Sequence, residues 1–229
     1  MLRPKKKITK REIKEDRLVT SYFEASTWYQ NNKKIVNGVL TGIVVLAIVI
    51  VAYTNNVSSN NQKATAELGK ILSYYDQGKY DLAIAGNLQE NVRGLQSIVD
   101  DYGSTKAGEL AGFYLANSYF AQGNYDKSLE YFLDVDVKDD LIGASALAGA
   151  GACYEAKGQY DKAASMFEKA AFKSAKDVNV PENMFHAAQN YLLAGNKEKA
   201  AELFKKVKKD YPTSGVAREI DRWIAEATA

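Results

Sequence analysis

The longest uninterrupted apolar stretch of the chain covers residues 35–53, which begin with Ile35 and end with Tyr53. None of these nineteen residues is charged, and a helix of that length spans about 28 Å, close to the ~30 Å hydrocarbon core of a bilayer. A buried helix of a soluble protein is an alternative interpretation, but such helices are rarely apolar on every face for five turns. The pattern therefore predicts a transmembrane helix.

A cleavable signal peptide is a second alternative for this segment. Thirty-four residues precede it, and no pair of small residues in the spacing of a cleavage site follows it. We therefore expect the segment to remain in the protein as an anchor. Within it, Gly38 and Gly42 form a Gly-x-x-x-Gly pair, a spacing that allows another membrane helix to approach closely but that also occurs by chance.

Residues 1–34 form a basic arm in which apolar side chains recur at helical spacing. Thr9 and Glu12 have the spacing of a capping box, and no Gly or Pro follows before Asn31, so we expect an N-terminal amphipathic helix. Three interpretations stay open for it. The helix lies on lipid headgroups, it docks on a partner protein, or the arm is a basic tail that only sets the membrane topology.

Beyond a polar linker at residues 54–63, one pattern of residues recurs four times. An aromatic residue is followed by Gly, then in three copies by a second aromatic residue, and then by a small residue. The copies are Tyr74–Gly78–Tyr80–Ala83, Tyr119–Gly123–Tyr125–Ser128, Tyr154–Gly158–Tyr160–Ala163 and Tyr191–Gly195–Lys197–Ala200. Their glycines are 45, 35 and 37 residues apart.

This pattern resembles the tetratricopeptide-repeat (TPR) family, whose helix–turn–helix units recur about every 34 residues. In such a unit the Gly ends the first helix with a positive φ, and the small residue lets the second helix lie close to the first. A single unit cannot bury its apolar face, so the units must stack. The resemblance implies an all-α fold, with an α-solenoid of about four TPR helix pairs over residues 64–229.

Three departures from the pattern carry structural expectations. The first repeat has about eleven extra residues between Ala85 and Gly94, so we expect its second helix to be broken or lengthened. Lys197 stands where an aromatic residue is usual, which loosens one contact. After Pro212, residues 213–229 have the apolar stripe of one more helix, which would cap the open end of the solenoid. We find no convincing β-strand.

In TPR arrays the first helices of successive repeats line a concave face. The register of the four glycines gives the candidates for a protein-binding groove: Leu68, Leu72, Tyr75, Leu110, Phe113, Asn117, Phe120, Glu155, Phe185, Gln189 and Leu192. Because the set is mostly apolar and lacks cations, it favours an amphipathic helix or an exposed hydrophobic segment over a C-terminal carboxylate. We expect about half of these side chains to pack between repeats.

The side chains that carry most enzyme chemistry are scarce. His186 is the only histidine and Cys153 the only cysteine, which excludes an intrachain disulfide and a multi-histidine metal site. We expect Cys153 to be a buried structural thiol and His186 an ordinary helix residue. The sequence therefore predicts no enzyme, no cofactor, no nucleic acid and no small-molecule substrate, and it favours other proteins and the lipid bilayer as partners.

Charge is distributed unevenly between the two ends of the chain. Residues 1–34 carry ten basic and four acidic side chains, and the rest of the chain carries 20 and 24. Lys33 and Lys34 directly precede the apolar segment, and no basic residue follows it until Lys63. The positive-inside rule therefore predicts that the N-terminus is cytoplasmic and that the TPR domain lies across the membrane.

Residues 8–16 and 102–108, and the layout of the whole chain, are similar to the YfgM family of bacterial inner-membrane proteins. That resemblance implies a single-pass protein of the inner membrane with its TPR domain in the periplasm. It also implies association with the Sec translocon and periplasmic chaperones, as an accessory factor that engages emerging chains. The alternative function is a structural scaffold subunit of another inner-membrane or envelope-assembly complex.

Overall fold

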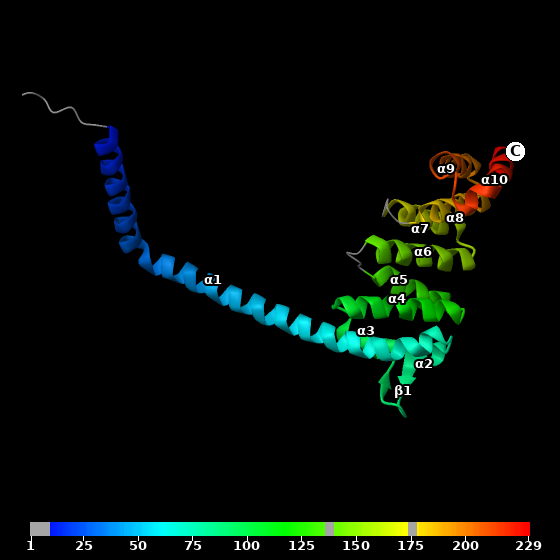
Figure 1. Ribbon diagram of the computed structural model, residues 1–229, viewed down its shortest axis with the longest axis horizontal. Helices are drawn as coiled ribbons and strands as arrows, with labels where there is room; N and C mark the ends of the chain where they lie inside the picture. Colours follow the sequence, from blue (N-terminus) through cyan, green and yellow to red (C-terminus); the bar gives the residue numbers. More distant parts are fainter. Residues whose placement is uncertain (1–9, 136–139, 174–177) are drawn as a thin grey trace, which may run out of the picture. The chain divides into compact units, whose positions relative to one another are not determined.

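The computed structural model describes residues 10–135, 140–173 and 178–229 (Figure 1), and it describes the side chains from residue 19 onward, except those of residues 140 and 141. The expected N-cap, Thr9, lies outside the described residues. The chain divides into two compact units, Met1–Asn56 and Val57–Ala229. Almost all regular structure within the described residues is helical, which confirms the all-α prediction.

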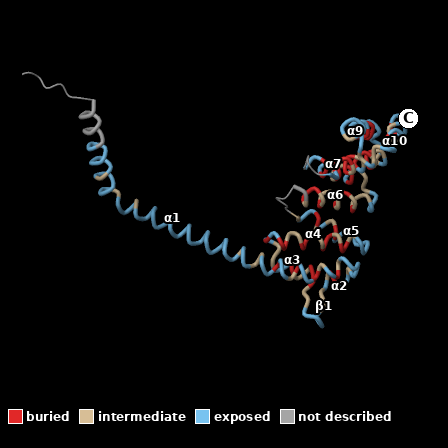
Figure 2. Tube along the Cα trace, in the orientation of Figure 1, coloured by how far each residue is buried: buried red, intermediate tan, exposed pale blue. Residues whose placement is uncertain are grey.

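The described part of the first unit belongs to a single helix, α1 (Lys10–Asp76). Its apolar segment is exposed apart from the half-buried Val36, and most of it is pale blue in Figure 2. Ile35 is 67%, Val39 57% and Tyr53 66% exposed. Within the described residues, α1 is the one helix that is long and apolar enough to cross a membrane.

The polar segment at residues 54–63, expected as a linker, is helical and belongs to α1. It contains no Gly or Pro that would end the helix. Asn61 already takes part in packing of the second unit, because its Oδ1 accepts a hydrogen bond of 2.9 Å from the backbone N–H of Ala107. The packed repeat unit therefore begins before residue 64.

The second unit is a stack of helix pairs. After the end of α1 follow α2 (Tyr80–Ala85), β1 (Gly86–Asn87), β2 (Val92–Arg93), α3 (Leu95–Tyr102), α4 (Lys106–Ala121), α5 (Tyr125–Asp134), α6 (Asp140–Ala156), α7 (Tyr160–Lys173), α8 (Val180–Leu193), α9 (Lys197–Asp210), η1 (Gly215–Glu219) and α10 (Ile220–Thr228). The first helices of the repeats are α1, α4, α6 and α8, and their partners are α2 with α3, α5, α7 and α9. Each pair packs on the next in layers, with the buried residues between them (Figures 1 and 2).

The four motif glycines adopt the same turn. Gly78, Gly123, Gly158 and Gly195 have φ values of 71°, 75°, 68° and 85°, in the left-handed region that glycine enters without a steric penalty. In the first repeat the N–H of Lys79 donates to the carbonyl of Tyr74 at 2.9 Å. The equivalent bond recurs in the other three repeats at 2.8–2.9 Å. This arrangement is the Schellman motif, which satisfies the last carbonyls of each first helix.

Small residues allow the helices to approach closely, as the repeat pattern predicts. A Cβ atom built on Gly149 of α6 would lie 2.4 Å from Cζ of Phe132 in α5. A Cβ atom on Gly151 would lie 2.9 Å from Cδ2 of Phe167 in α7. The α6 helix therefore meets one aromatic ring from each neighbouring second helix at a glycine.

The extra residues of the first repeat form a β-hairpin, so the expected broken helix is confirmed and the expected absence of strands is wrong. Strands β1 and β2 are antiparallel, with Gly86 opposite Arg93. Gly86 has a φ of 88°, and a Cβ atom on Gly94 would lie 2.2 Å from the carbonyl oxygen of Ile84. Both ends of the hairpin therefore need glycine, and the second helix divides into α2 and α3.

The hairpin is tied to α1 by the motif tyrosine of the first repeat. The Tyr74 hydroxyl donates to Oε2 of Glu90 at 2.7 Å and accepts from Nδ2 of Asn87 at 3.0 Å. Leu88, which lies between these two hairpin residues, is 95% exposed.

Residues 213–229 cap the array, with a 3₁₀ turn (η1) before α10. Ile220 is 1% exposed. The Trp223 ring lies 5.7 Å from that of Phe185 in α8 and 5.9 Å from that of Phe204 in α9. The capping helix therefore covers apolar surface of the last repeat, as predicted.

Candidate protein-binding surface

Four positions on each first helix share one side, because they follow one another at spacings of three, four and three residues. We name these sixteen side chains the first-helix face. They are Thr65, Leu68, Leu72 and Tyr75 on α1, Leu110, Phe113, Asn117 and Phe120 on α4, Ser145, Ala148, Ala152 and Glu155 on α6, and Glu182, Phe185, Gln189 and Leu192 on α8. All eleven groove candidates belong to it.

The first-helix face is neither fully buried nor freely exposed. Leu68 is buried at 4% exposure, Thr65 is exposed, and the other fourteen side chains are half-buried. Some rings of the face also contact neighbouring helices. The ring centroids of Tyr75 and Tyr114, in successive repeats, are 4.9 Å apart, and those of Phe120 and Tyr125, within one repeat, are 5.3 Å apart.

The polar groups of the face cluster at α6 and α8. Glu155 Oε2 accepts a hydrogen bond of 2.8 Å from Nδ2 of Asn190, which also donates to the carbonyl of His186 at 3.0 Å. Asn190 is fully buried. Oε2 of Glu182 is buried and has no hydrogen-bond partner among the described residues. The face holds two carboxylates and no Lys or Arg.

The sequence prediction missed five members of this face: Thr65, Ser145, Ala148, Ala152 and Glu182. All five are small or polar, and the prediction included few residues of that kind. The same three–four–three register, applied to every first helix, would have found them.

A polar cluster beside this surface joins three helices. Oε2 of Glu168 in α7 accepts from the Tyr191 hydroxyl at 2.6 Å and from the Lys199 ammonium at 2.7 Å. Burial raises the pKa of Glu168, but these two hydrogen bonds outweigh burial and lower it. The hydrogen bond to Glu168 raises the pKa of Lys199. Because all three groups are mutually satisfied, the cluster stabilises the packing of α7, α8 and α9.

Cys153 and His186 have the surroundings of structural residues. Cys153 is fully buried, its thiol donates to Oγ of Ser128 at 3.2 Å, and burial raises its pKa. This confirms the prediction of a buried thiol. His186 is exposed and stacks on Phe167 at 5.1 Å. In the part of the chain that the structure describes, no three His, Cys, Asp or Glu side chains form a metal-binding group.

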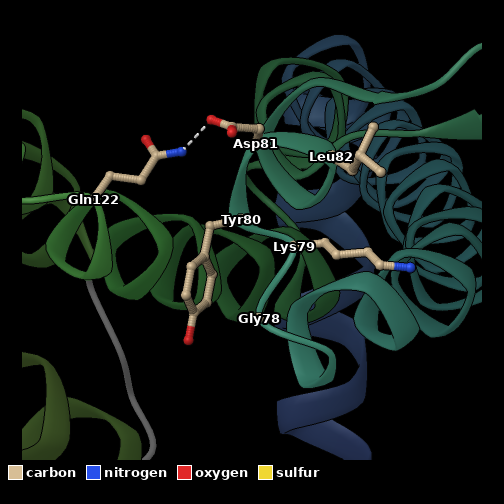
Figure 3. Close-up of a pocket in the computed structure, with 6 residues that line it drawn as sticks. All are labelled: Gly78, Lys79, Tyr80, Asp81, Leu82 and Gln122. Carbon is tan, nitrogen blue, oxygen red and sulfur yellow. Dashed lines mark hydrogen bonds between the residues drawn. The ribbon is translucent and has the colours of Figure 1, made fainter.

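An open pocket of about 440 Å³ lies at the junction of the first two repeats (Figure 3). It is lined by residues 78–82 and by Gln122, whose Nε2 donates to Oδ1 of Asp81 at 2.6 Å. Lys157 and Asp126 form an ion pair at the equivalent place in the next junction. Because a contact recurs at this place in two successive junctions, we interpret it as part of the packing between repeats.

Comparisons with known proteins agree with this geometry. Residues 113–179 and 182–214 each match a family model of the tetratricopeptide repeat. No curated protein matches the chain. Among solved structures, the nearly identical TPR-like repeats of a putative kinesin light chain from Podosopora anserina, and a single-substitution variant of them, each match with 17% identity and a TM-score of 0.54. The matches cover 73% of this chain and 86% and 85% of those chains.

At that identity the likeness shows the fold alone, and the family matches identify its repeats. The chain therefore carries tetratricopeptide repeats, a fold that typically serves as a non-catalytic scaffold for binding other proteins.

Proposed function

We propose that this chain is a membrane-anchored protein-binding module. Residues 35–53 form its single span, the arm before them is cytoplasmic, and the repeat unit lies in the periplasm of a bacterium. The first-helix face binds apolar segments of emerging chains or of chaperones at the Sec translocon. The observation that carries the binding proposal is the row of large apolar side chains that the first helices leave half-buried.

The apolar row supports protein binding because its members lie on the same side of two successive first helices. Leu72 and Tyr75 on α1 are followed by Leu110, Phe113 and Phe120 on α4, and all five are half-buried. Burying the remaining apolar area against a partner is favourable by about 25 cal/mol per Å². Large apolar side chains that gather on one side of a repeat array, unlike scattered single residues, commonly mark an interaction site.

The exposed apolar segment supports the anchor. Its large side chains, such as Ile35 and Val39, are surrounded by no other part of the described chain. Exposing such a segment to water is unfavourable in free energy, whereas placing it in the hydrocarbon core of a bilayer removes that cost. Lys33 and Lys34 at its start, with no basic residue before Lys63, support a cytoplasmic N-terminus.

The binding proposal is tested with Leu110→Glu, which places a charge on the first-helix face. Leu133→Glu is the matched control, because Leu133 lies on the second helix α5 and is 50% exposed. Each full-length variant is purified from its own membranes in mild detergent, and the bound proteins are quantified by mass spectrometry. We expect Leu110→Glu to lose partners that Leu133→Glu retains, and melting temperatures of both variants separate loss of binding from loss of the fold. Equal partner recovery from both variants would contradict the proposal.

The same experiment tests the site of action. Translocon subunits together with assorted secreted chains are expected from a periplasmic accessory factor of the Sec machinery. Stoichiometric recovery of one defined membrane complex without them would contradict that role and indicate a dedicated scaffold subunit.

A further inference from the structure

Building on the proposed function, we infer that the first-helix face selects a helical segment that carries two basic side chains about two turns apart. Large apolar side chains of the partner lie between these two cations. The inference rests on the charge of the face, on the spacing of its carboxylates, and on the size of the side chains between them.

The charge of the first-helix face has one sign. Glu155 and Glu182 are its only carboxylic acids, and none of its sixteen members is Lys or Arg. Oε2 of Glu182 is buried without a hydrogen-bond partner among the described residues, and a buried carboxylate oxygen without a donor is unfavourable. Glu182 as a whole is half-buried, so an ammonium or guanidinium group from a partner pairs with this side chain at the surface in a charge-assisted interaction.

The distance between the two carboxylates is set by α8. Glu155 reaches Asn190 of α8 with a hydrogen bond of 2.8 Å, so its carboxylate lies level with that residue. Asn190 follows Glu182 by eight residues on the same helix, which corresponds to about 12 Å of helical rise. On a partner helix aligned with α8, positions i and i+7 share one face and are about 10.5 Å apart, which long basic side chains extend to this separation.

The members of the first-helix face that precede Glu155 on α6 have short side chains. Ser145, Ala148 and Ala152 occupy positions where α4 carries Leu110, Phe113 and Asn117 and where α8 carries Glu182, Phe185 and Gln189. Short side chains extend less far from the helix axis than the rows on both sides. Large apolar side chains of the partner, at i+3 and i+4 between its two cations, are therefore accommodated over α6.

Glu182 also has a local structural role, and the test must separate this role from partner binding. It lies in the first turn of α8, where a carboxylate interacts favourably with the positive end of the helix dipole. Glu198 occupies the first turn of α9, is exposed, and lies on a second helix. Glu198→Gln therefore removes the same kind of dipole contact without changing the first-helix face.

The test uses the full-length chain in detergent and labelled helical peptides, with affinity measured by fluorescence anisotropy. One peptide has Lys at i and i+7 and Leu at i+3 and i+4, and its matched partner has Gln in place of both Lys. A third has the Lys composition of the first but contains a central Pro that prevents a helix. The protein variants are Glu155→Gln, Glu182→Gln and the control Glu198→Gln, measured at about 0.05 M and about 0.3 M salt.

We expect the Lys peptide to bind at least about tenfold more tightly than the Gln peptide at low salt, and the difference to shrink at high salt. Glu155→Gln and Glu182→Gln each weaken the Lys peptide about fivefold and leave the Gln peptide unchanged. Glu198→Gln changes neither peptide.

Equal binding of the Lys and Gln peptides would overturn this inference while the binding proposal stands. If the Pro peptide bound as tightly as the helical Lys peptide, the inference that the partner segment is helical would be overturned. If neither helical peptide binds at any concentration tested, the inference and the proposed binding function both fail. Because the comparison between peptides requires no change in the protein, its outcome does not depend on the stability of any variant.

Discussion

The close contact between α5 and α6 predicts a large effect from one added methyl group, in the variant Gly149→Ala. In the structure, a Cβ atom at residue 149 lies 2.4 Å from Cζ of Phe132 and 2.7 Å from its two Cε atoms. Ordinary contact begins near 3.4 Å, so the ring must retreat by about 1 Å. Phe132 is 4% exposed and packs on Phe113 at 5.8 Å, which leaves it little room to move.

Two opposing effects determine the size of the change. Overpacking of a buried site costs roughly 1–3 kcal/mol, whereas replacing Gly by Ala in a helix interior gains about 1 kcal/mol. We therefore expect a net loss of about 0–2 kcal/mol, which lowers the melting midpoint of a unit of this size by up to roughly 8 °C. Gly69→Ala, in the interior of α1 with no atom within 4 Å of the new Cβ, isolates the helix-propensity gain.

Thermal melting of the full-length chain in detergent, followed by circular dichroism, measures the effect. Midpoints are compared, because a repeat array need not unfold in one step. The double variant Gly149→Ala with Phe132→Leu removes the ring atoms that clash, so it is expected to recover stability relative to the sum of the single changes. A Gly149→Ala melting midpoint equal to or above that of Gly69→Ala would refute the close crossing of α5 and α6.

Further measurements test other features of the repeat unit. Gly158→Ala is expected to lower stability by about 1 kcal/mol, because its φ of 68° is unfavourable for alanine; an unchanged midpoint would contradict this turn. Cys153 is buried with a raised pKa, so a thiol reagent is expected to label only the unfolded chain; rapid labelling of the native chain would contradict its burial. Glu168→Gln is expected to cost about 1 kcal/mol at pH 7. Hydrogen bonds from Lys199 and Tyr191 outweigh burial and lower the Glu168 pKa, so the wild-type advantage exists above the ordinary Glu pKa and disappears as the pH falls through the lowered one. Melting curves that show an equal loss at pH 7 and at about pH 3 would contradict it.

The repeat architecture was predictable from the sequence because its determinants are local and recur. A glycine at each first-helix end specifies a positive φ, and all four motif glycines have it. The buried small residues that follow, such as Ala83 and Ser128, permit close helix packing. Lys197 stands at the usual aromatic position of the fourth copy without disrupting that repeat. Its other motif residues, such as Ala200 and Phe204, are fully buried.

The parts that the sequence did not predict depend on distant contacts. The hairpin between α2 and α3 is held by the Tyr74 hydroxyl, which lies 13 and 16 residues before its partners Asn87 and Glu90. The linker prediction relied on polar composition, although a segment without Gly or Pro is free to remain helical. The exposure of a side chain on the first-helix face depends on neighbouring helices that are distant in the sequence. Phe185 of α8, for example, is partly covered by the ring of Trp223 in α10.

The most direct test of the central proposal is site-specific photocrosslinking of the full-length chain in its native membranes. A photoreactive amino acid replaces Phe120 on the first-helix face in one variant and Leu133 on α5 in the other. We predict that the probe at residue 120 crosslinks to other polypeptides and that the probe at residue 133 does not. Equal crosslinking from both positions, or none from residue 120, would contradict the proposal that the first-helix face is the binding surface.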